Sequence, residues 1–226
     1  MSSTVNRWLD TLGKQRQPHE HDGKRLLSDV GIAVPEGILI EPDTQFSIDG
    51  QIDVSGSADH FAVKVCSPDI LHKTEEDGVM LGLEADELDQ AVQTVLSRFP
   101  DSPVLVERMV RSFGPEIIVG ALHDPVFGPA VMAGAGGIYT ELYSDAAFRL
   151  APCTGVEAER MLSELTVYPA LTGFRGIGTD VKTLAAIVEK VSNLATLLMH
   201  SGGQLDINPI VWDSSKWVVL DVKMIL

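Results

Sequence analysis

A lysine in the middle of an apolar strand pattern constrains this chain more than any other feature. In residues 61–65 every second side chain is large and apolar, which is typical of a strand with one buried face. The residues on that face are Phe61, Val63 and Val65. Lys64 therefore points to the opposite face, where an ammonium group is costly unless an anion compensates it.

The residues after this strand form a polar loop that leads into a return strand. Pro68 cannot donate a hydrogen bond to a strand ladder, so the strand ends before it. The loop carries His72, Lys73 and a cluster of acidic residues before Gly78, and an apolar run follows. A histidine and a second lysine close to the strand lysine indicate that the compensating anion is a phosphate.

The composition limits the classes of partner. The formal net charge of −15 argues against nucleic acid and anionic membranes, because both attract clustered Lys and Arg. Two cysteines among 226 residues indicate a reduced, cytoplasmic setting without a disulfide framework. The polar start lacks the apolar core of a signal peptide, and no apolar run reaches the roughly 20 residues of a membrane helix.

The remaining periodicities predict an α/β fold. Helices are expected at 22–30, 83–99, 154–165 and 179–200, and extended segments or strands at 32–40, 104–106, 116–122, 127–133, 204–212 and 216–225. Residues 1–20 are expected to form a short helix followed by a polar linker that continues to residue 21, with no predicted chemistry. The glycines at 134–137 match neither a Walker loop nor a Rossmann fingerprint, because the required flanking residues and spacing are missing.

Seven sequence blocks, in order along the chain, resemble one family. They are LLSDVGIAVPEG, VKVCSPDILHKTEEDGV, LVERMV, GPEIIVGALHDPVFGPAVMAGAGGIYTELYSDAAFRLAP, YPALTGFRG, LDINPIVW and LDVKM. Together they resemble the ATP-grasp (beta) subunit of NDP-forming acyl-CoA synthetases, which is related to succinyl-CoA synthetase beta chains. The resemblance covers most of residues 22–224.

The resemblance implies an α/β ATP-grasp fold of two lobes with the nucleotide cleft between them. Residues 1–20 would be an N-terminal segment, 21–106 the first lobe and 107–226 the second lobe. The implied enzyme is an ADP-forming acyl-CoA synthetase, an acid–thiol ligase, which converts acyl-CoA, ADP and phosphate reversibly to acid, CoA and ATP. It would use Mg²⁺, and it would need a CoA-binding alpha subunit that carries the first phosphohistidine.

The resemblance also assigns the residues that hold the nucleotide. Lys64 matches the phosphate-binding lysine, and Lys73 would stabilise the transferred group. Glu107 and Glu116 match the glutamates at and after the hinge, which hold the adenosine part. Val110 stands where the hinge backbone would lie close to the base.

Four further residues are assigned to metal binding and phosphoryl transfer. Asn208 and Asp221 offer the hard oxygen donors that suit Mg²⁺, and they match the family's metal ligands. His72 matches a loop histidine that relays the phosphoryl group, since an imidazole nitrogen can accept it. Asp206 matches the carboxylate that orients this histidine.

The sequence departs from the family pattern in two places. Asp77 replaces the first of two glycines that usually close the loop, and three neighbouring acids would repel a triphosphate unless they face solvent. Residues 41–60 are poor in helix formers where the family usually has a helix, so loop or short strands are expected there.

Two other functions remain open from the sequence. A stand-alone ATP-grasp ligase could join a carboxylate to an amine, although it would need no phosphohistidine. A non-catalytic nucleotide-sensing module would use the same fold for regulation. Identifying a companion chain would separate these alternatives.

Overall fold

The computed structural model describes residues 1–42, 44, 60–70, 73, 75–137, 145–174, 178–199 and 202–226. The chain divides into two compact units. The smaller unit contains His19–His21 and Pro35–Val110, and the larger unit contains Met1–Pro18, Asp22–Val34 and Arg111–Leu226. The expected loop or short strands at 41–60 fall almost entirely outside the described residues.

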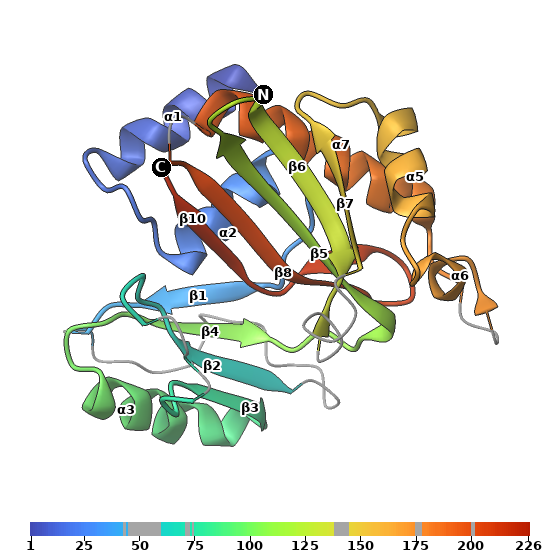
Figure 1. Cartoon of the computed structure of the whole chain (residues 1–226). Helices are drawn as coiled ribbons and strands as arrows, with labels where there is room; N and C mark the ends of the chain where they lie inside the picture. The colour runs from blue at the N-terminus through green and yellow to red at the C-terminus, as the bar shows by residue number, and fades with distance from the viewer. Residues whose placement is uncertain are drawn as a thin grey trace. The chain divides into compact units, whose positions relative to one another are not determined.

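Within the described residues, the smaller unit is an antiparallel sheet with helix α3 (Leu88–Arg98) against it (Figure 1). The strand order is β1 (Gly37–Ile40), β4 (Val104–Arg108), β2 (Phe61–Val65) and β3 (Val79–Leu83). The pairing of β2 with β3 confirms the predicted strand and its return strand. Helix α3 contacts β2, β3 and β4. The side chains of Phe61, Val63 and Val65 enter the core that α3 covers, which leaves Lys64 on the other face.

The start of this helix lies later than predicted. A helix was expected from Leu83, but Leu83 is the last residue of β3. Glu84 and Glu87 form a capping box, in which the backbone N–H of Glu84 donates to Glu87 Oε2 at 2.8 Å. This reciprocal cap stabilises a short 3₁₀ turn, η1 (Ala85–Glu87), before α3 begins.

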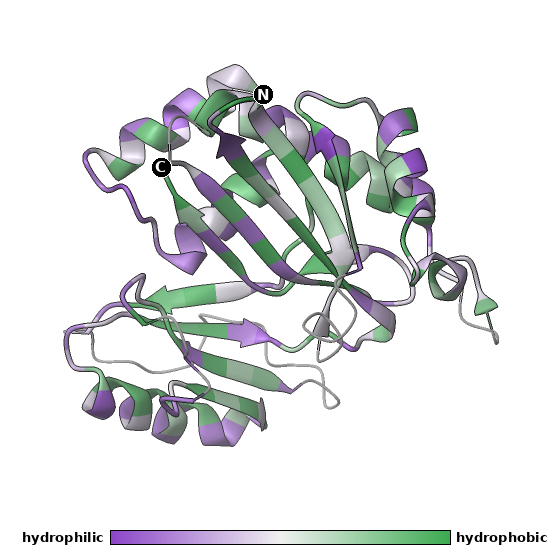
Figure 2. Cartoon of the chain, in the orientation of Figure 1, coloured by the Kyte–Doolittle hydropathy of each residue, from purple (hydrophilic) through white to green (hydrophobic). Residues whose placement is uncertain are grey.

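The larger unit contains a six-stranded antiparallel sheet (Figure 1). Its main strand order is β10 (Val222–Ile225), β8 (Gln204–Trp212), β5 (Phe113–Asp124), β6 (Gly128–Ala135) and β7 (Ala146–Leu150), and β9 (Trp217–Val219) also pairs with β8. Among its described residues, the helices of this unit are α1 (Ser2–Leu12), α2 (Glu20–Asp29, in part), α5 (Gly155–Ser163), α6 (Tyr168–Leu171) and α7 (Val181–Leu198). Figure 2 shows that helix α7, whose residues are mostly apolar, lies along the sheet. Strand β7 and helix α6 were not predicted.

One face of this sheet forms the core with α5 and α7. Alternate residues of β5 and β8, such as Val119 and Ile207, are buried against residues of α7, such as Val188. The helix begins after Asp180, whose carboxylate accepts a hydrogen bond from the Thr183 N–H at 3.1 Å. The residues between those of the buried face, including Gly120 on β5 and Asp206 on β8, therefore belong to the opposite face of the sheet.

The units follow different boundaries from those expected. Residues 1–20 and 21–106 were predicted to form an N-terminal segment and a first lobe. Instead, Val5 and Trp8 of α1, together with Leu26 and Ile32, are buried in the core of the larger unit. The predicted linker at 15–21 is also shorter, because Glu20 is already the first residue of α2.

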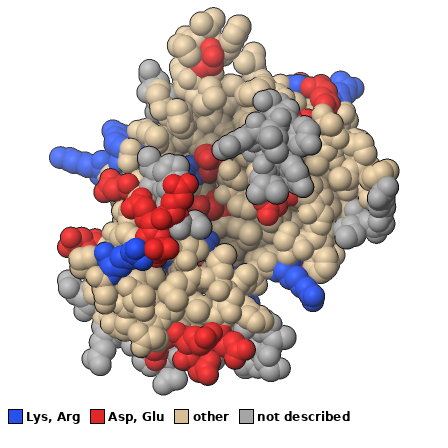
Figure 3. All heavy atoms as spheres, turned by 60° about the horizontal axis from the view of Figure 1, so that its bottom comes forward, with Lys and Arg blue, Asp and Glu red and all other residues tan. Residues whose placement is uncertain are grey.

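Within the described residues, no helix combines the length and the apolar character that a membrane crossing requires. Cys66 and Cys153, the two cysteines of the sequence, are both buried thiols. Figure 3 shows several groups of Asp and Glu side chains on the face that it presents, in keeping with the net charge of −15. A negatively charged ligand therefore depends on locally placed cations.

Candidate functional site

The smaller unit holds a buried charge cluster of Glu20, Lys64, Lys73 and Glu107. The Lys64 ammonium lies 2.8 Å from Glu107 Oε2 and 3.2 Å from Glu20 Oε1. The Lys73 ammonium lies 2.6 Å from Glu20 Oε2. The side chains of Glu20 and Glu107 are 2% and 3% exposed, so these ion pairs lie largely out of water. Two cations and two anions thus compensate one another, as burial of charge requires.

Neighbouring strands of the smaller sheet bring part of this cluster together. Lys64 on β2 lies opposite Leu105 of β4, and Glu107 is two residues further along β4, so both side chains leave the same face. Gly37 on β1 is the direct partner of Glu107. A Cβ atom on Gly37 would lie 2.7 Å from Glu107 Cγ, so the missing side chain makes room for this carboxylate. In this structure Glu107 therefore contacts the lysine assigned to phosphate.

Sequence reasoning missed Glu20. It was included in a polar linker, whereas it begins α2 and bridges both lysines. The available signal was an acidic residue at the start of a helical pattern, where carboxylates are favoured. That signal does not reveal the partners, because they lie 44 and 53 residues away in the sequence.

Gly78 closes the loop that follows β2 and fixes the backbone of Lys73. The Gly78 N–H donates to the Lys73 carbonyl at 2.6 Å, and the Gly78 carbonyl accepts from the Val65 N–H at 2.7 Å. A Cβ atom on Gly78 would lie 2.6 Å from Val65 Cγ1, so a larger residue does not fit. His72, the predicted phosphoryl relay, lies outside the described residues.

Asp77 occupies a backbone conformation that suits the glycine of the family pattern. Its φ is 51°, in the left-handed region that Asp tolerates better than most residues. Its carboxylate lies 2.9 Å from Arg98 on α3, and the pair is exposed. Glu75 and Glu76 are also exposed, so the three acids meet the condition of facing solvent.

Val110 and Glu116, the other two residues assigned to the nucleotide, lie in different units. Val110 is half-buried and is the last residue of the smaller unit. Glu116 is half-buried on β5, and its carbonyl accepts a hydrogen bond from the Gly136 N–H at 2.7 Å. A Cβ atom on Gly137 would lie 2.9 Å from Glu116 Oε2, so the glycine-rich stretch packs closely around this glutamate.

The larger unit brings Asn208 and Asp221 together on adjacent parts of the sheet. The Asn208 N–H donates to the Asp221 carbonyl at 3.2 Å, next to the paired residues Ile207 and Val222. Asn208 is exposed and Asp221 is half-buried. Their amide and carboxylate oxygens fit Mg²⁺, which takes few protein ligands and fills its other positions with water and phosphate. No cluster of three or more His, Cys, Asp or Glu suited to a metal occurs within the described part of the chain.

Asp206 lies two residues before Asn208 on β8, opposite Lys223 of β10. The residue is exposed at the surface of the sheet, yet the protein atoms around it remove part of the hydration of its carboxylate. This burial raises the pKa of Asp206, and the positive charge of Lys223 offsets part of the effect. The alternation along β8 gives Asp206 and Asn208 the same face, as predicted.

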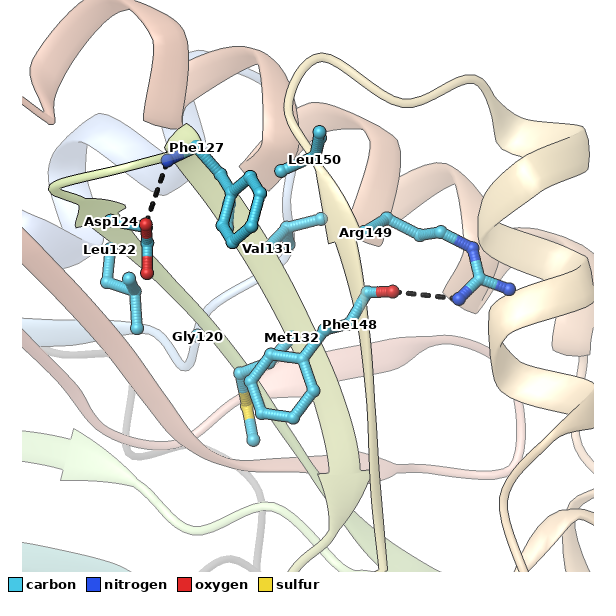
Figure 4. Close-up of a pocket in the computed structure, with 10 residues that line it drawn as sticks. Gly120, Leu122, Asp124, Phe127, Val131, Met132, Phe148, Arg149 and Leu150 are labelled. Atoms are coloured by element: carbon cyan, nitrogen blue, oxygen red, sulfur yellow. Dashed lines mark hydrogen bonds between the residues drawn. The ribbon is translucent and has the colours of Figure 1, made fainter.

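An apolar groove lies over β5, β6 and β7, with a cavity volume of about 320 Å³ (Figure 4). Gly120, Met132 and Phe148 line it and are cross-strand partners in one row. Asp206 is the next residue of the same row, because it pairs with Gly120. A Cβ atom on Gly120 would approach Met132 Cγ to 3.1 Å, so this glycine leaves space at the floor of the groove.

The charged groups of the groove already have partners. Asp124 Oδ1 accepts hydrogen bonds from the backbone N–H groups of Val126 and Phe127 in the hairpin turn, which lower the pKa of Asp124. Figure 4 shows the bond from Phe127. The Arg149 guanidinium pairs with the carboxylate of Glu164. The groove is therefore mainly an apolar surface. The two lysines of the buried charge cluster are also paired with carboxylates, but one carboxylate brings both cations together, so they remain the better candidates for phosphate binding.

The predicted site residues thus fall into two groups. The smaller unit brings together Lys64, Lys73 and Glu107. The larger unit brings together Asp206, Asn208 and Asp221, while Glu116 lies on β5 of the same sheet.

Comparison with known proteins identifies the ATP-grasp family, which the sequence blocks resemble. The model of the ATP-grasp domain family matches residues 12–226. The subunit beta of the ADP-forming acetate–CoA ligase I of Pyrococcus furiosus is 36% identical over 217 residues, covering 92% of this chain and 90% of the relative. The ADP-forming acetate–CoA ligase I of Archaeoglobus fulgidus is also 36% identical, over 90% of this chain but only 31% of the relative.

A similar solved structure is the dinucleotide-forming acetyl-coenzyme A synthetase 1 of Candidatus Korarchaeum cryptofilum in complex with coenzyme A, Ca-AMPCP and HgCl⁺. It is 27% identical with a TM-score of 0.80, and both chains are covered completely. Another structure of that enzyme contains coenzyme A and Mg-AMPPCP, with a TM-score of 0.76. The chain therefore belongs to the ATP-grasp family, in the group that contains the beta subunits of ADP-forming acetate–CoA ligases.

Proposed function

We propose that this chain is the nucleotide-binding subunit of an ADP-forming acyl-CoA synthetase. In this function it transfers a phosphoryl group between a phosphohistidine and ADP or ATP, within the reversible conversion of acyl-CoA, ADP and phosphate to acid, CoA and ATP. The observation that carries the proposal is the buried charge cluster, in which one carboxylate holds two lysines. Paired lysine cations of this kind suit the charge of a nucleotide's phosphates.

The other assigned residues take complementary roles in nucleotide binding. Lys64 and Lys73 bind the phosphates, while Glu107, Val110 and Glu116 hold the adenosine part. Asn208 and Asp221 would hold Mg²⁺, which neutralises phosphate charge when it is bound. A Korarchaeum enzyme similar to this chain has been solved with Mg-AMPPCP, which supports Mg²⁺ and an adenine nucleotide as the ligands.

His72 is the proposed phosphoryl carrier. In the direction from ATP, an unprotonated imidazole nitrogen attacks the terminal phosphorus, an N–P bond forms, and the O–P bond to ADP breaks. ADP leaves with the electron pair of that bond, and Asp206 orients the imidazole. Because the attacking nitrogen must be unprotonated, the reaction should slow as the pH falls and the imidazole takes up a proton.

The proposal includes a partner chain. This chain spans nine tenths of a separate beta subunit, but about a third of the single-chain relative from Archaeoglobus. We expect the CoA site and the first phosphohistidine to be supplied by a CoA-binding alpha subunit in a cytoplasmic hetero-oligomer. In a related Korarchaeum structure, a phosphohistidine segment points towards the nucleotide binding site.

Replacing Lys64 tests nucleotide binding directly. We expect Lys64→Ala to weaken the binding of Mg-ADP by at least ~10-fold, or about 1.4 kcal/mol, because it removes a largely buried cation from the phosphate site. Calorimetric titration of the whole chain measures this. Lys216→Ala is the matched control, since Lys216 is exposed in the turn after β8 and its loss removes the same charge. Equal affinities in the two variants would contradict the assignment of Lys64 to phosphate.

A further inference from the structure

Glu20 connects two segments of the smaller unit that both carry a lysine. Its side chain is only 2% exposed, and each of its carboxylate oxygens contacts a different ammonium group. Oε1 lies 3.2 Å from Lys64 on β2, and Oε2 lies 2.6 Å from Lys73 in the loop that follows. One carboxylate therefore holds two cations from separate segments next to each other.

Stability alone is a poor explanation for this arrangement. The two ammonium groups that approach Glu20 repel each other, although Glu107 balances the second positive charge, and removing all four charges from water is costly. Buried ion pairs can often be replaced by apolar residues without loss of stability. The arrangement is better explained by a need for two adjacent cations.

The backbone contacts of Lys73 strengthen this interpretation. The Gly78 N–H holds the Lys73 carbonyl at 2.6 Å, and Gly78 is itself hydrogen-bonded to Val65 at the end of β2. The backbone and the ammonium group of Lys73 are thus held by separate contacts. Since Lys73 directly follows His72 in the sequence, these contacts also fix the chain one residue after the proposed carrier.

We propose that Glu20 is a positioning residue, which holds the ammonium groups of Lys64 and Lys73 as a pair that receives a phosphate group of the nucleotide. This inference rests on the proposed nucleotide function and adds a residue that acts through the lysines. Glu20 carries the same charge as the phosphates, so it favours binding only by orienting the two cations. If Glu20 acted only by repelling the phosphates, removing its charge would strengthen nucleotide binding, whereas loss of positioning would weaken it. An experiment can therefore distinguish the two effects.

The test is calorimetric titration of the whole chain with Mg-ADP. We expect E20Q to bind on the order of tenfold more weakly, because a charge-assisted hydrogen bond that orients a lysine is lost. Lys73→Met should also weaken binding. In the double variant the two losses should not add, because Glu20 acts partly through Lys73. A purely structural effect of E20Q would instead add to that of Lys73→Met.

Glu76→Gln is the matched control, because Glu76 is exposed in the same loop and its replacement removes the same charge. We expect its affinity to equal that of the wild type or to be slightly higher. The positioning role is overturned if E20Q binds Mg-ADP as tightly as the wild type or more tightly. It is also overturned if the losses of affinity add in the double variant.

A second variant keeps the test decisive if E20Q does not fold. E20D retains the charge but withdraws the carboxylate from the lysines, so weaker binding is expected, and wild-type affinity in E20D overturns the inference. A wild-type chain that does not bind Mg-ADP contradicts the proposed function as well. The expected loss in Lys64→Ala combined with no loss in E20Q contradicts the positioning role alone.

Discussion

Asp206 and Asp213 lie seven positions apart, and the fold shifts their pKa values in opposite directions. Burial raises the pKa of Asp206, whose carboxylate loses hydration on the sheet. Burial also acts to raise the pKa of Asp213, but hydrogen bonds from Ser215 and the Lys216 N–H outweigh it, so the pKa is lowered. One acid therefore destabilises the folded state at neutral pH, and the other stabilises it.

This contrast predicts opposite effects on the pH dependence of stability. The folded state binds the Asp206 proton more tightly than the unfolded state, so its contribution is favourable at low pH and is lost as the pH rises through the folded pKa. Asp206→Asn should therefore raise the free energy of unfolding near neutral pH, with a gain that disappears towards pH ~3.

Asp213→Asn is the matched variant, for which we expect the opposite change in the free energy of unfolding. The contribution of Asp213 is present above the unfolded pKa and is lost as the pH falls through the lowered folded pKa, so this variant should be less stable near neutral pH. Denaturant unfolding across this pH range measures both differences. Shifts of the same sign in the two variants would contradict the pKa directions.

For individual residues, the sequence predicted some members of the site better than others. Lys64 was identifiable because a charge interrupts an alternating apolar pattern, which is a local signal. Glu20 gave no such signal, since its partners are 44 and 53 residues away. The predicted roles of the individual residues remain proposals that the titrations test.

Strand β1 pairs with β4 at the edge of the smaller sheet, and one glycine makes this pairing possible beside the buried charge cluster. A Cβ atom on Gly37 would lie 2.8 Å from the Val106 carbonyl oxygen, a backbone atom that cannot move aside easily. We expect Gly37→Ala to destabilise the smaller unit by ~1–3 kcal/mol through overpacking. It should also displace Glu107, which the same Cβ atom would approach to 2.7 Å.

Hydrogen exchange can assign this effect to the smaller sheet. The three tryptophans, Trp8, Trp212 and Trp217, all belong to the larger unit, so their fluorescence would not report on β1. Amides of β1 and β4 should lose protection in Gly37→Ala while those of β8 keep it. Gly178→Ala is the control, because its Cβ atom would meet nothing closer than 3.7 Å. Unchanged protection of β1 in Gly37→Ala would contradict this account.

The elements that were predicted correctly are those with a regular buried face. On β2, Phe61, Val63 and Val65 are buried on one face, and the buried residues of α7 follow the period of 3.6 residues. Strand β7 was missed because its apolar residues are on both faces: Ala147 is buried, whereas Phe148 and Leu150 are each 58% exposed. Such a pattern does not indicate which side is the core.

For the whole molecule, the family resemblance predicted the ATP-grasp fold, and the comparisons confirm it. The contiguous boundaries of the expected lobes differ from the observed units, because residues at the start of the chain join the larger core. An amphipathic helix such as α1 shows which of its faces is apolar but not which of two cores receives it. The order of the segments along the sequence therefore did not reveal which of the two compact units each segment joins.

Phosphoryl transfer through His72 is the central claim for the whole molecule, and trapping of labelled phosphate tests it most directly. The chain is incubated with Mg²⁺ and ATP labelled at the terminal phosphate, and protein-bound label is then tested for stability. We predict acid-labile, base-stable label on the wild type and on His123→Ala, which replaces a half-buried histidine of β5. His72→Ala should bind ADP but carry no label.

With the companion chain, His72→Ala should also lose acyl-CoA-driven ATP synthesis by at least ~10³-fold, because no other group replaces a covalent carrier. A wild-type chain without label would favour a carboxylate–amine ligase or a nucleotide-sensing module, neither of which needs a phosphohistidine. Undiminished label on His72→Ala would show that another residue carries the phosphate, and it would contradict the proposed relay.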